Sequence, residues 1–156
     1  MLSENLEKTL HKAFNTARSR RQLHISADDL LLYLLDDPDA KLVLAACQAN
    51  IEEMRVALTA AVAKGSTIAK GKSEVDTQPT LDLQRVIQRS IMHVQSTSSP
   101  MNSKLVTGAN VLVAIFGEKE SKAVEILLSQ GVTRLDAVSF IAHGITKTSA
   151  DGSAET

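Results

Sequence analysis

Residues 26–35 read S-A-D-D-L-L-L-Y-L-L, and a second copy of the pattern, T-G-A-N-V-L-V-A-I-F, lies 81 positions further on at residues 107–116. Each copy begins with a hydroxyl residue followed three positions later by a short polar acceptor, a pattern that satisfies free N–H groups at a helix start. The residues that follow are apolar on almost all sides, which is typical of a helix enclosed by other helices. The sequence therefore predicts a duplicated chain with two equivalent buried helices.

The duplication extends to both sides of these helices. Downstream, residues 36–55 match residues 117–136 without a gap, which places Cys47 opposite Leu128. Upstream, the apolar stripes match at an offset of 77, so the second copy holds four extra residues in the loop 97–106. Stacked repeat arrays generally need three or more units to bury a continuous face. Two copies therefore predict one compact all-α domain, built from two four-helix repeats related by a pseudo-two-fold axis.

Start and stop signals divide each repeat into four helices. Asp37 is followed by a proline, which loses no hydrogen bond in the first helical turn. Gly65 and Gly144 can end helices because glycine adopts positive φ without strain. The expected helices are residues 3–19, 26–35, 37–48, 50–64, 81–96, 107–116, 119–129 and 133–143.

Two stretches lack helical periodicity. Residues 65–79 link the two halves, and this length is unusual within a compact domain, which favours a mobile or functional linker. Residues 145–156 have too few apolar side chains to fold and are typical of the beginning of a flexible linker. We therefore place the domain at residues 1–144, with repeat one at about 1–64 and repeat two at about 80–144.

The composition fits one soluble globular domain. Of 156 residues, 44% are apolar and 22% are charged, and a chain of this length can bury a full core. The net charge is −1 with dispersed lysines and arginines, so no basic face is available for nucleic acid. No segment approaches the roughly 18 uninterrupted apolar residues of a membrane helix. We expect a cytoplasmic protein with neither a nucleic-acid nor a membrane partner.

Motifs of catalysis and metal binding are absent from the sequence. There is no glycine-rich phosphate loop and no nucleophile elbow, so the chain is not expected to hydrolyse ATP or to be an enzyme. The four histidines have no i, i+4 spacing, and a single cysteine cannot supply a thiolate cluster, so we expect no metal and no cofactor. The apolar surroundings of Cys47 favour an inert core thiol over a reactive one.

Three acidic pairs and one basic pair are the remaining candidate sites. The acidic pairs at 28–29, 36–37 and 52–53 each lie at a predicted helix start, where carboxylates complement the helix dipole. Capping is therefore favoured over two-carboxylate catalysis. Arg85 and Arg89 lie one turn apart on the polar face of the fifth helix, a spacing that fits either a solvated face or a functional site.

Three segments closely resemble one family. They are 76–96 (DTQPTLDLQRVIQRSIMHVQS), 106–116 (VTGANVLVAIF) and 133–144 (TRLDAVSFIAHG), and they resemble the Clp N-domain family, in particular the N-domains of ClpA-type unfoldases. The similarity spans nearly the whole chain. It implies a duplicated helical domain that a flexible linker joins to two AAA+ ATPase modules, which use ATP and Mg and stack on the ClpP peptidase. None of those modules lies in this chain.

The resemblance also implies a function and a site. In the family this domain docks the ClpS adaptor, which delivers substrates with N-terminal degradation signals, and it makes weak contacts with some substrates. The adaptor-facing positions correspond to Leu23, Asp28, Thr80 and Arg85, where the start of the second helix is expected to meet the start of the fifth. Leu23 departs from the family pattern, in which an acidic residue is usual, and Gln22 stands where a histidine is usual.

Two alternatives remain open from the sequence alone. One is a free-standing Clp N-like protein that modulates a Clp complex without an ATPase motor of its own. The other, from a different class, is a small helical hydrolase, which the missing motifs disfavour.

Overall fold

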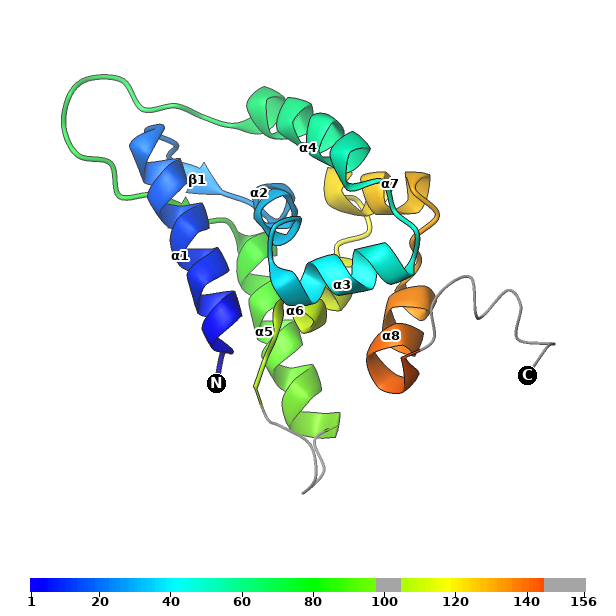
Figure 1. The fold of residues 1–156 in the computed structure, drawn as a ribbon. Helices are drawn as coiled ribbons and strands as arrows, with labels where there is room; N and C mark the ends of the chain where they lie inside the picture. The colour runs from blue at the N-terminus through cyan, green and yellow to red at the C-terminus, as the bar shows by residue number, and fades with distance from the viewer. Residues whose placement is uncertain (98–104, 145–156) are drawn as a thin grey trace.

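The computed structural model describes residues 1–97 and 105–144, and this part of the chain contains eight helices (Figure 1). The expected all-α fold of two four-helix repeats is confirmed. The predictions made for the loop 98–104 and the tail 145–156 lie outside the described residues. The helices are α1 (Glu4–Ser19), α2 (Ala27–Leu34), α3 (Pro38–Ala46), α4 (Ile51–Gly65), α5 (Leu81–Thr97), α6 (Gly108–Ile115), α7 (Lys122–Ser129) and α8 (Arg134–His143).

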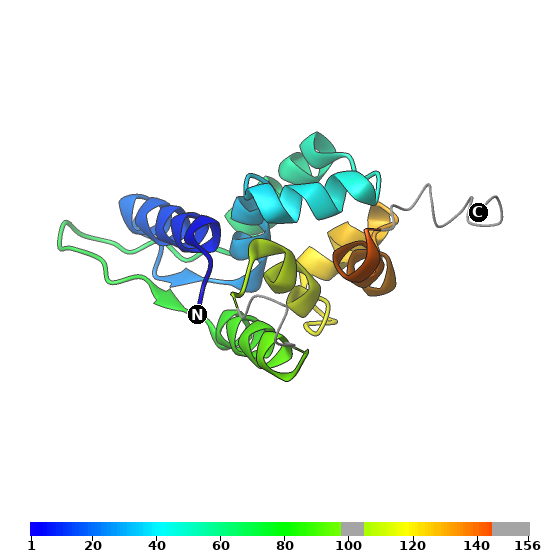
Figure 2. The same cartoon turned by 60° about the horizontal axis from the view of Figure 1, so that its bottom comes forward.

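The packing of the helices follows a pseudo-two-fold axis between α2 and α6. Within the repeats, α1 packs on α2 as α5 packs on α6, and α4 contacts α2 as α8 contacts α6. Between the repeats, α4 contacts α7 as α8 contacts α3, and α2 contacts α6 directly. The two central helices are therefore enclosed by the other six (Figures 1 and 2).

The two central helices begin in the same way. The N–H of Ser26 donates to the Asp29 carboxylate at 2.8 Å, and the N–H of Asp29 donates to Ser26 Oγ at 3.3 Å. In α6 the N–H of Thr107 donates to Asn110 Oδ1 at 2.8 Å, and the return bond measures 3.4 Å. Both predicted capping boxes are present, so the same local signal starts both helices.

A single core contains side chains from both repeats. The equivalent pair Leu31 and Leu112 is fully buried, as is the equivalent pair Leu34 and Ile115. Full burial of each such side chain contributes about 1.5–3 kcal/mol relative to leaving it exposed. The apolar run that identified the duplication therefore forms the centre of the core.

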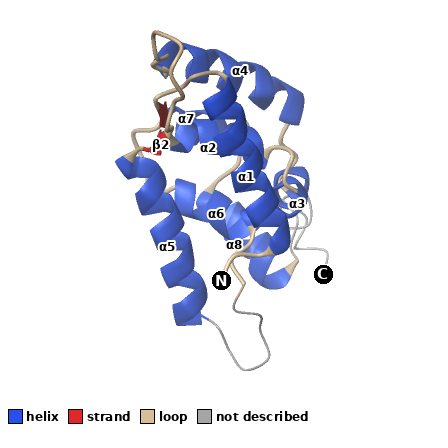
Figure 3. Cartoon of the chain, turned by 90° about the vertical axis from the view of Figure 1, so that its left-hand side faces the viewer, coloured by secondary structure: helices blue, strands red, loops and turns tan. Residues whose placement is uncertain are grey.

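Two short parallel ladders, which the sequence did not predict, join the helix starts of different repeats. Strands β1 (His24–Ile25) and β2 (Gln78–Pro79) pair directly before α2 and α5 (Figure 3). Leu2 and Val106 form an equivalent parallel bridge before α1 and α6. In each ladder the next residue's N–H donates across to the partner strand at 2.8–2.9 Å. The ladders are therefore related by the same pseudo-two-fold axis.

The linker between the repeats lies along the segment that follows α1. The N–H of Leu23 donates to the carbonyl of Thr67, and the N–H of Ala69 donates to the carbonyl of Arg21. Thr77 Oγ1 also donates to the backbone of this segment at 2.7 Å. These bonds fix residues 21–23, which directly precede β1.

The ungapped match of residues 36–55 with 117–136 is wrong by two residues. The N–H of Ala49 donates to Leu44 O beyond α3, and the equivalent bond beyond α7 runs from Val132 to Leu127, each at 3.0 Å. These pairs differ by 83 positions rather than 81. The two extra residues lie in the loop between α6 and α7, and α7 begins later than predicted, at Lys122.

This shift changes the counterpart of Cys47. With the corrected register, Cys47 lies opposite Gln130 and not opposite Leu128. Cys47 is buried, as predicted, whereas more than half of the Leu128 side chain is exposed. The inserted loop is polar and has no helical period, so the sequence pattern did not reveal it.

Candidate functional site

The four residues implied as adaptor-facing lie on the two segments that the β1–β2 ladder joins. Leu23 precedes β1, and Asp28 lies in the first turn of α2. Thr80 follows β2, and Arg85 lies in the second turn of α5. The starts of the second and fifth helices are therefore neighbours, as the family resemblance implied.

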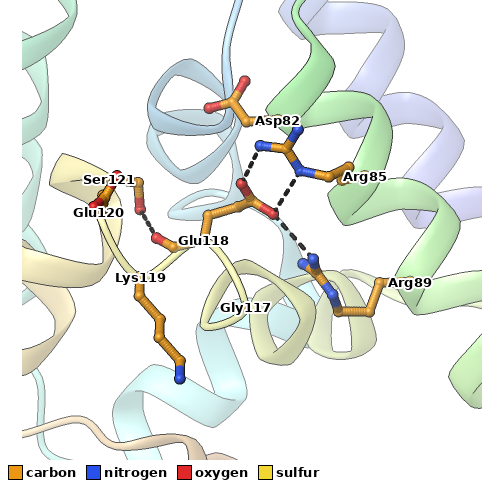
Figure 4. A pocket seen from close by; sticks show the side chains of 8 residues that line it. All are labelled: Asp82, Arg85, Arg89, Gly117, Glu118, Lys119, Glu120 and Ser121. Carbon is orange, nitrogen blue, oxygen red and sulfur yellow. Dashed lines mark hydrogen bonds and ion pairs between the residues drawn. The ribbon is translucent and has the colours of Figure 1, made fainter.

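Arg85 forms an ion pair with a carboxylate that the sequence analysis did not identify. Arg85 Nη2 and Nε donate to the two oxygens of Glu118 at 2.7 and 3.2 Å (Figure 4). Arg89 Nη2 donates to the same carboxylate at 3.0 Å, and Arg89 Nη1 donates to the carbonyl of Ala114 at 2.8 Å. The hydrogen bonds from Arg85, followed by those from Arg89, lower the pKa of Glu118 below its usual range, and the same carboxylate raises the pKa of Arg85. The side chain of Glu118 is only 9% exposed, against 55% for Arg85.

The loop between α6 and α7 holds Glu118 in this position. Its N–H donates to Ile115 O at 2.9 Å, and its carbonyl accepts from both the N–H and the hydroxyl of Ser121, which caps α7. The Arg89 guanidinium lies against the Cα of Gly117, so that any Cβ at this position would overlap it. Glycine is therefore required for the arginine to reach the loop.

The Asp28 carboxylate accepts a hydrogen bond from the backbone of another helix in the domain. Its Oδ1 accepts the N–H of Ala123 in the first turn of α7 at 2.7 Å. Burial raises the pKa of Asp28, with the nearby carboxylates of Asp82 and Asp29 adding to this effect, while the Ala123 N–H opposes it. The acidic pair at 28–29 does cap helices, as predicted, but Asp28 caps a helix of the other repeat.

The other predicted positions differ in how much they offer to a partner. The Thr80 hydroxyl donates to the Asp82 carboxylate and accepts the N–H of Leu83 at 3.4 Å. Leu23 presents a partly exposed apolar side chain, with an exposed fraction of 37%. Gln22 is buried and its amide lies 3.3 Å from Asp29 Oδ1, so this side chain does not reach the surface. Arg85 is therefore the most accessible polar group of the predicted site.

Among residues 1–97 and 105–144, no three His, Cys, Asp or Glu side chains are grouped so that they could hold a metal ion. None of the helices in this part of the chain is sufficiently long and apolar to span a membrane.

Comparison with known sequences relates the chain to a family and to a curated protein. The family model described as Clp repeat (R) N-terminal domain matches residues 1–130. A curated protein of Fuscovulum blasticum, described as a ClpA homolog protein, is 44% identical over 146 residues. That alignment covers 93% of this chain and 18% of the relative, so the chain spans about a fifth of the relative's length.

Solved structures share the fold. The N-domain of ClpV from Vibrio cholerae superposes with a TM-score of 0.67 at 16% identity, covering 90% of this chain and 82% of that chain. A complex of the ClpV N-domain with a VipB peptide gives a TM-score of 0.67 at 16% identity, covering 91% of this chain and 85% of that chain. At these identities the likeness establishes the fold alone.

Proposed function

Since this chain belongs to the Clp repeat N-terminal domain family, we propose that it is the adaptor- and substrate-docking domain of a ClpA-type unfoldase, an ATP-dependent protein that feeds substrates to the ClpP peptidase. The similarity to a protein described as a ClpA homolog supports this parent. On this proposal the parent is cytoplasmic, ATP and Mg bind to modules elsewhere in it, and this domain binds without catalysing a reaction.

We place the docking of a ClpS-type adaptor at the surface formed by Leu23, Asp28, Thr80 and Arg85. The observation that carries this placement is the geometry of Arg85. Its guanidinium is held by two bonds to the nearly buried Glu118, while 55% of its side chain remains exposed. A guanidinium has five N–H donors, so three remain for a partner. Because the side chain is already fixed, binding costs less conformational entropy.

The remaining members of the surface have supporting roles. Leu23 supplies an exposed apolar contact where the family pattern has an acidic residue. Asp28 and Thr80 accept N–H groups in the first turns of α7 and α5, respectively. These hydrogen bonds hold the two helix starts that surround Arg85. The ClpV N-domain bound to a VipB peptide supports the ability of this fold to bind a peptide segment.

Calorimetric titration of the domain with its cognate ClpS-type adaptor tests this proposal. Arg85→Ala is expected to weaken adaptor binding about ten- to a hundredfold, as for a central interface arginine, while the melting temperature falls only slightly because Arg89 still binds Glu118. Arg89→Ala is not a suitable control, because Arg89 binds the same carboxylate and the carbonyl of Ala114. The matched control is Lys8→Ala, since Lys8 is the pseudo-two-fold counterpart of Arg85 and is 72% exposed.

Two outcomes contradict the placement of the docking surface. Wild-type adaptor affinity in Arg85→Ala shows that the adaptor docks elsewhere. An equal loss of affinity in Lys8→Ala and Arg85→Ala shows that long-range charge, rather than a specific contact, controls binding.

A further inference from the structure

A cavity of about 260 Å3 lies between α5, α6 and the beginning of α8. It is smaller than a typical ligand pocket of about 300–1,000 Å3, so its size suits a single side chain rather than a large cofactor. Three side chains of its floor are apolar and each is less than one-tenth exposed. They are Val113, Ala114 and Phe116.

The described residues that line this cavity include the basic residues Arg89, Lys119 and Arg134, and none of these described lining residues is an aspartate or a glutamate. Arg89 is anchored by Ala114 and Glu118, and its Nε carries no hydrogen bond to the described residues. Lys119 and Arg134 form neither an ion pair nor a hydrogen bond within residues 1–97 and 105–144. The Lys119 side chain extends away from Glu118 (Figure 4). The cavity therefore has unneutralised positive charge at its rim.

The position of Arg134 adds an unfavourable electrostatic contribution at this cavity. Arg134 is the first residue of α8, where the positive end of the helix dipole disfavours a cation. Like charges that converge without a partner also raise the free energy of the folded state. A bound anion relieves both effects.

Asn110 supplies a neutral donor to the same cavity. Its Oδ1 accepts the N–H and the hydroxyl of Thr107 in the capping box that starts α6. These two bonds show which end of the Asn110 amide is the oxygen. The NH2 group at the other end has no hydrogen-bond acceptor among the described residues. The cavity therefore combines guanidinium, ammonium and amide donors with an apolar floor.

We propose that this cavity binds the free C-terminal carboxylate of a polypeptide whose last residue is apolar. Arg134 and Arg89 can each offer paired N–H donors to a carboxylate, and Lys119 adds a third charge. The apolar side chain of the terminal residue covers the floor formed by Val113 and Phe116, a surface that inorganic phosphate would leave unused. This inference rests on the proposed role of the domain in contacting substrates, but it does not depend on adaptor docking.

Fluorescence anisotropy with the 156-residue chain tests the proposal. The probe is a labelled octapeptide that ends in leucine with a free carboxylate, and it is compared with the same peptide amidated at its C-terminus. The free carboxylate is expected to bind at least about tenfold more tightly, since hydrogen bonds to a charged group account for such a difference. A third peptide, ending in aspartate with a free carboxylate, is expected to bind less tightly than the leucine peptide.

Matched variants locate the site. Arg134→Gln and Lys119→Gln are each expected to remove most of the preference for the free carboxylate, and both positions are exposed, so the fold is retained. Lys122→Gln is the control, because Lys122 is an exposed cation of the same region that pairs with Glu125 and does not line the cavity.

Three results overturn the proposal. The first is equal affinity of the domain for the free and the amidated leucine peptide. The second is that both Arg134→Gln and Lys119→Gln keep the wild-type preference for the free carboxylate. The third is equal affinity for the aspartate and leucine peptides, together with displacement of both by millimolar phosphate. The last result indicates a site for anions in general. Adaptor affinity measured with the same variants separates this failure from failure of the proposed adaptor surface, since Arg134→Gln should bind the adaptor normally.

Discussion

The two repeats place an acidic residue just beyond their central helices, Asp37 beyond α2 and Glu118 beyond α6, and they use it differently. Asp37 is 1% exposed, accepts two N–H groups of the first turn of α3 at 2.9 and 3.1 Å, and accepts the hydroxyl of Thr9 at 2.7 Å. Glu118 makes no bond of this kind to α7 and instead binds Arg85 and Arg89. Asp37 therefore caps a helix of its own repeat, whereas Glu118 binds two arginines near the surface.

The difference follows from the two residues inserted before α7. The insertion moves the start of α7 away from Glu118, and Ser121 and Asp28 supply the caps that Asp37 alone supplies to α3. The Glu118 carboxylate is therefore not needed as a cap and binds Arg85 and Arg89 of α5. The counterpart of the surface around Arg85 lies in the other repeat, where Lys8 pairs with Glu4 at 3.4 Å and with no other described residue. A small insertion in a duplicated fold is sufficient to make one of two equivalent surfaces distinct.

The largest expected effect tests whether the cores of the two repeats are equivalent. Leu31→Ala and Leu112→Ala should each lower the free energy of unfolding by about 2–5 kcal/mol, because both side chains are fully buried and their truncation leaves a cavity. Urea denaturation measures the loss. Leu135→Ala serves as the control, since its side chain is 73% exposed and should change stability by no more than about 0.5 kcal/mol. A small loss for only one of the two core variants contradicts the equivalence.

The next effect concerns the two acids themselves. Asp37→Ala should cost about 2–3 kcal/mol, because it removes a helix cap and leaves the Thr9 hydroxyl without this acceptor. Glu118→Ala should cost about 1 kcal/mol or less, since the arginines that it binds reach solvent. Chemical denaturation of the two variants under the same conditions gives the comparison. Equal losses would mean that both acids stabilise their repeats to the same extent.

A smaller effect is expected at the cap that crosses the pseudo-two-fold axis. Asp28→Ala should cost about 1 kcal/mol through the loss of the bond to Ala123. Asp28→Asn should cost much less, because its amide oxygen can still accept that N–H while the buried charge disappears. Because the folded-state pKa of Asp28 is raised, the wild type gains relative stability as pH falls through that pKa. Thermal melting of both variants at neutral pH is the measurement, and equal destabilisation would argue against a penalty for the buried charge.

The smallest effect is the pH dependence of the arginine cluster. The folded-state pKa of Glu118 lies below its ordinary value of 4.5, so the stabilisation by Arg85 and Arg89 is present above about pH 4.5 and is lost as pH falls through the lower value. Glu118→Gln should therefore lose less stability than the wild type between pH 4.5 and the acid transition, by under about 1 kcal/mol. Stability curves measured against pH provide the test. Parallel curves for the two proteins would show that the cluster contributes nothing.

The sequence by itself determined the eight helices and their grouping into two repeats. Capping boxes at Ser26 and Thr107, the proline after Asp37 and the apolar runs are all local signals, readable within a few residues. The burial of the two central helices followed from the same runs, because a helix that is apolar on almost all sides must be enclosed by other helices. The position of Arg85 on the polar face of the fifth helix was also readable, although its partner was not.

Only the tertiary structure decided which groups meet across the domain. Glu118 lies 33 positions from Arg85, and Ala123 lies 95 positions from Asp28, so no periodic pattern connects them. The two-residue ladders are likewise too short to leave a strand pattern in the sequence. A polar side chain finds its partner according to the packing of distant helices, whereas helix starts and buried faces depend on neighbouring residues. For this reason the fold could be predicted from the sequence, while the use of Glu118, Asp28 and the cationic cavity became apparent only in three dimensions.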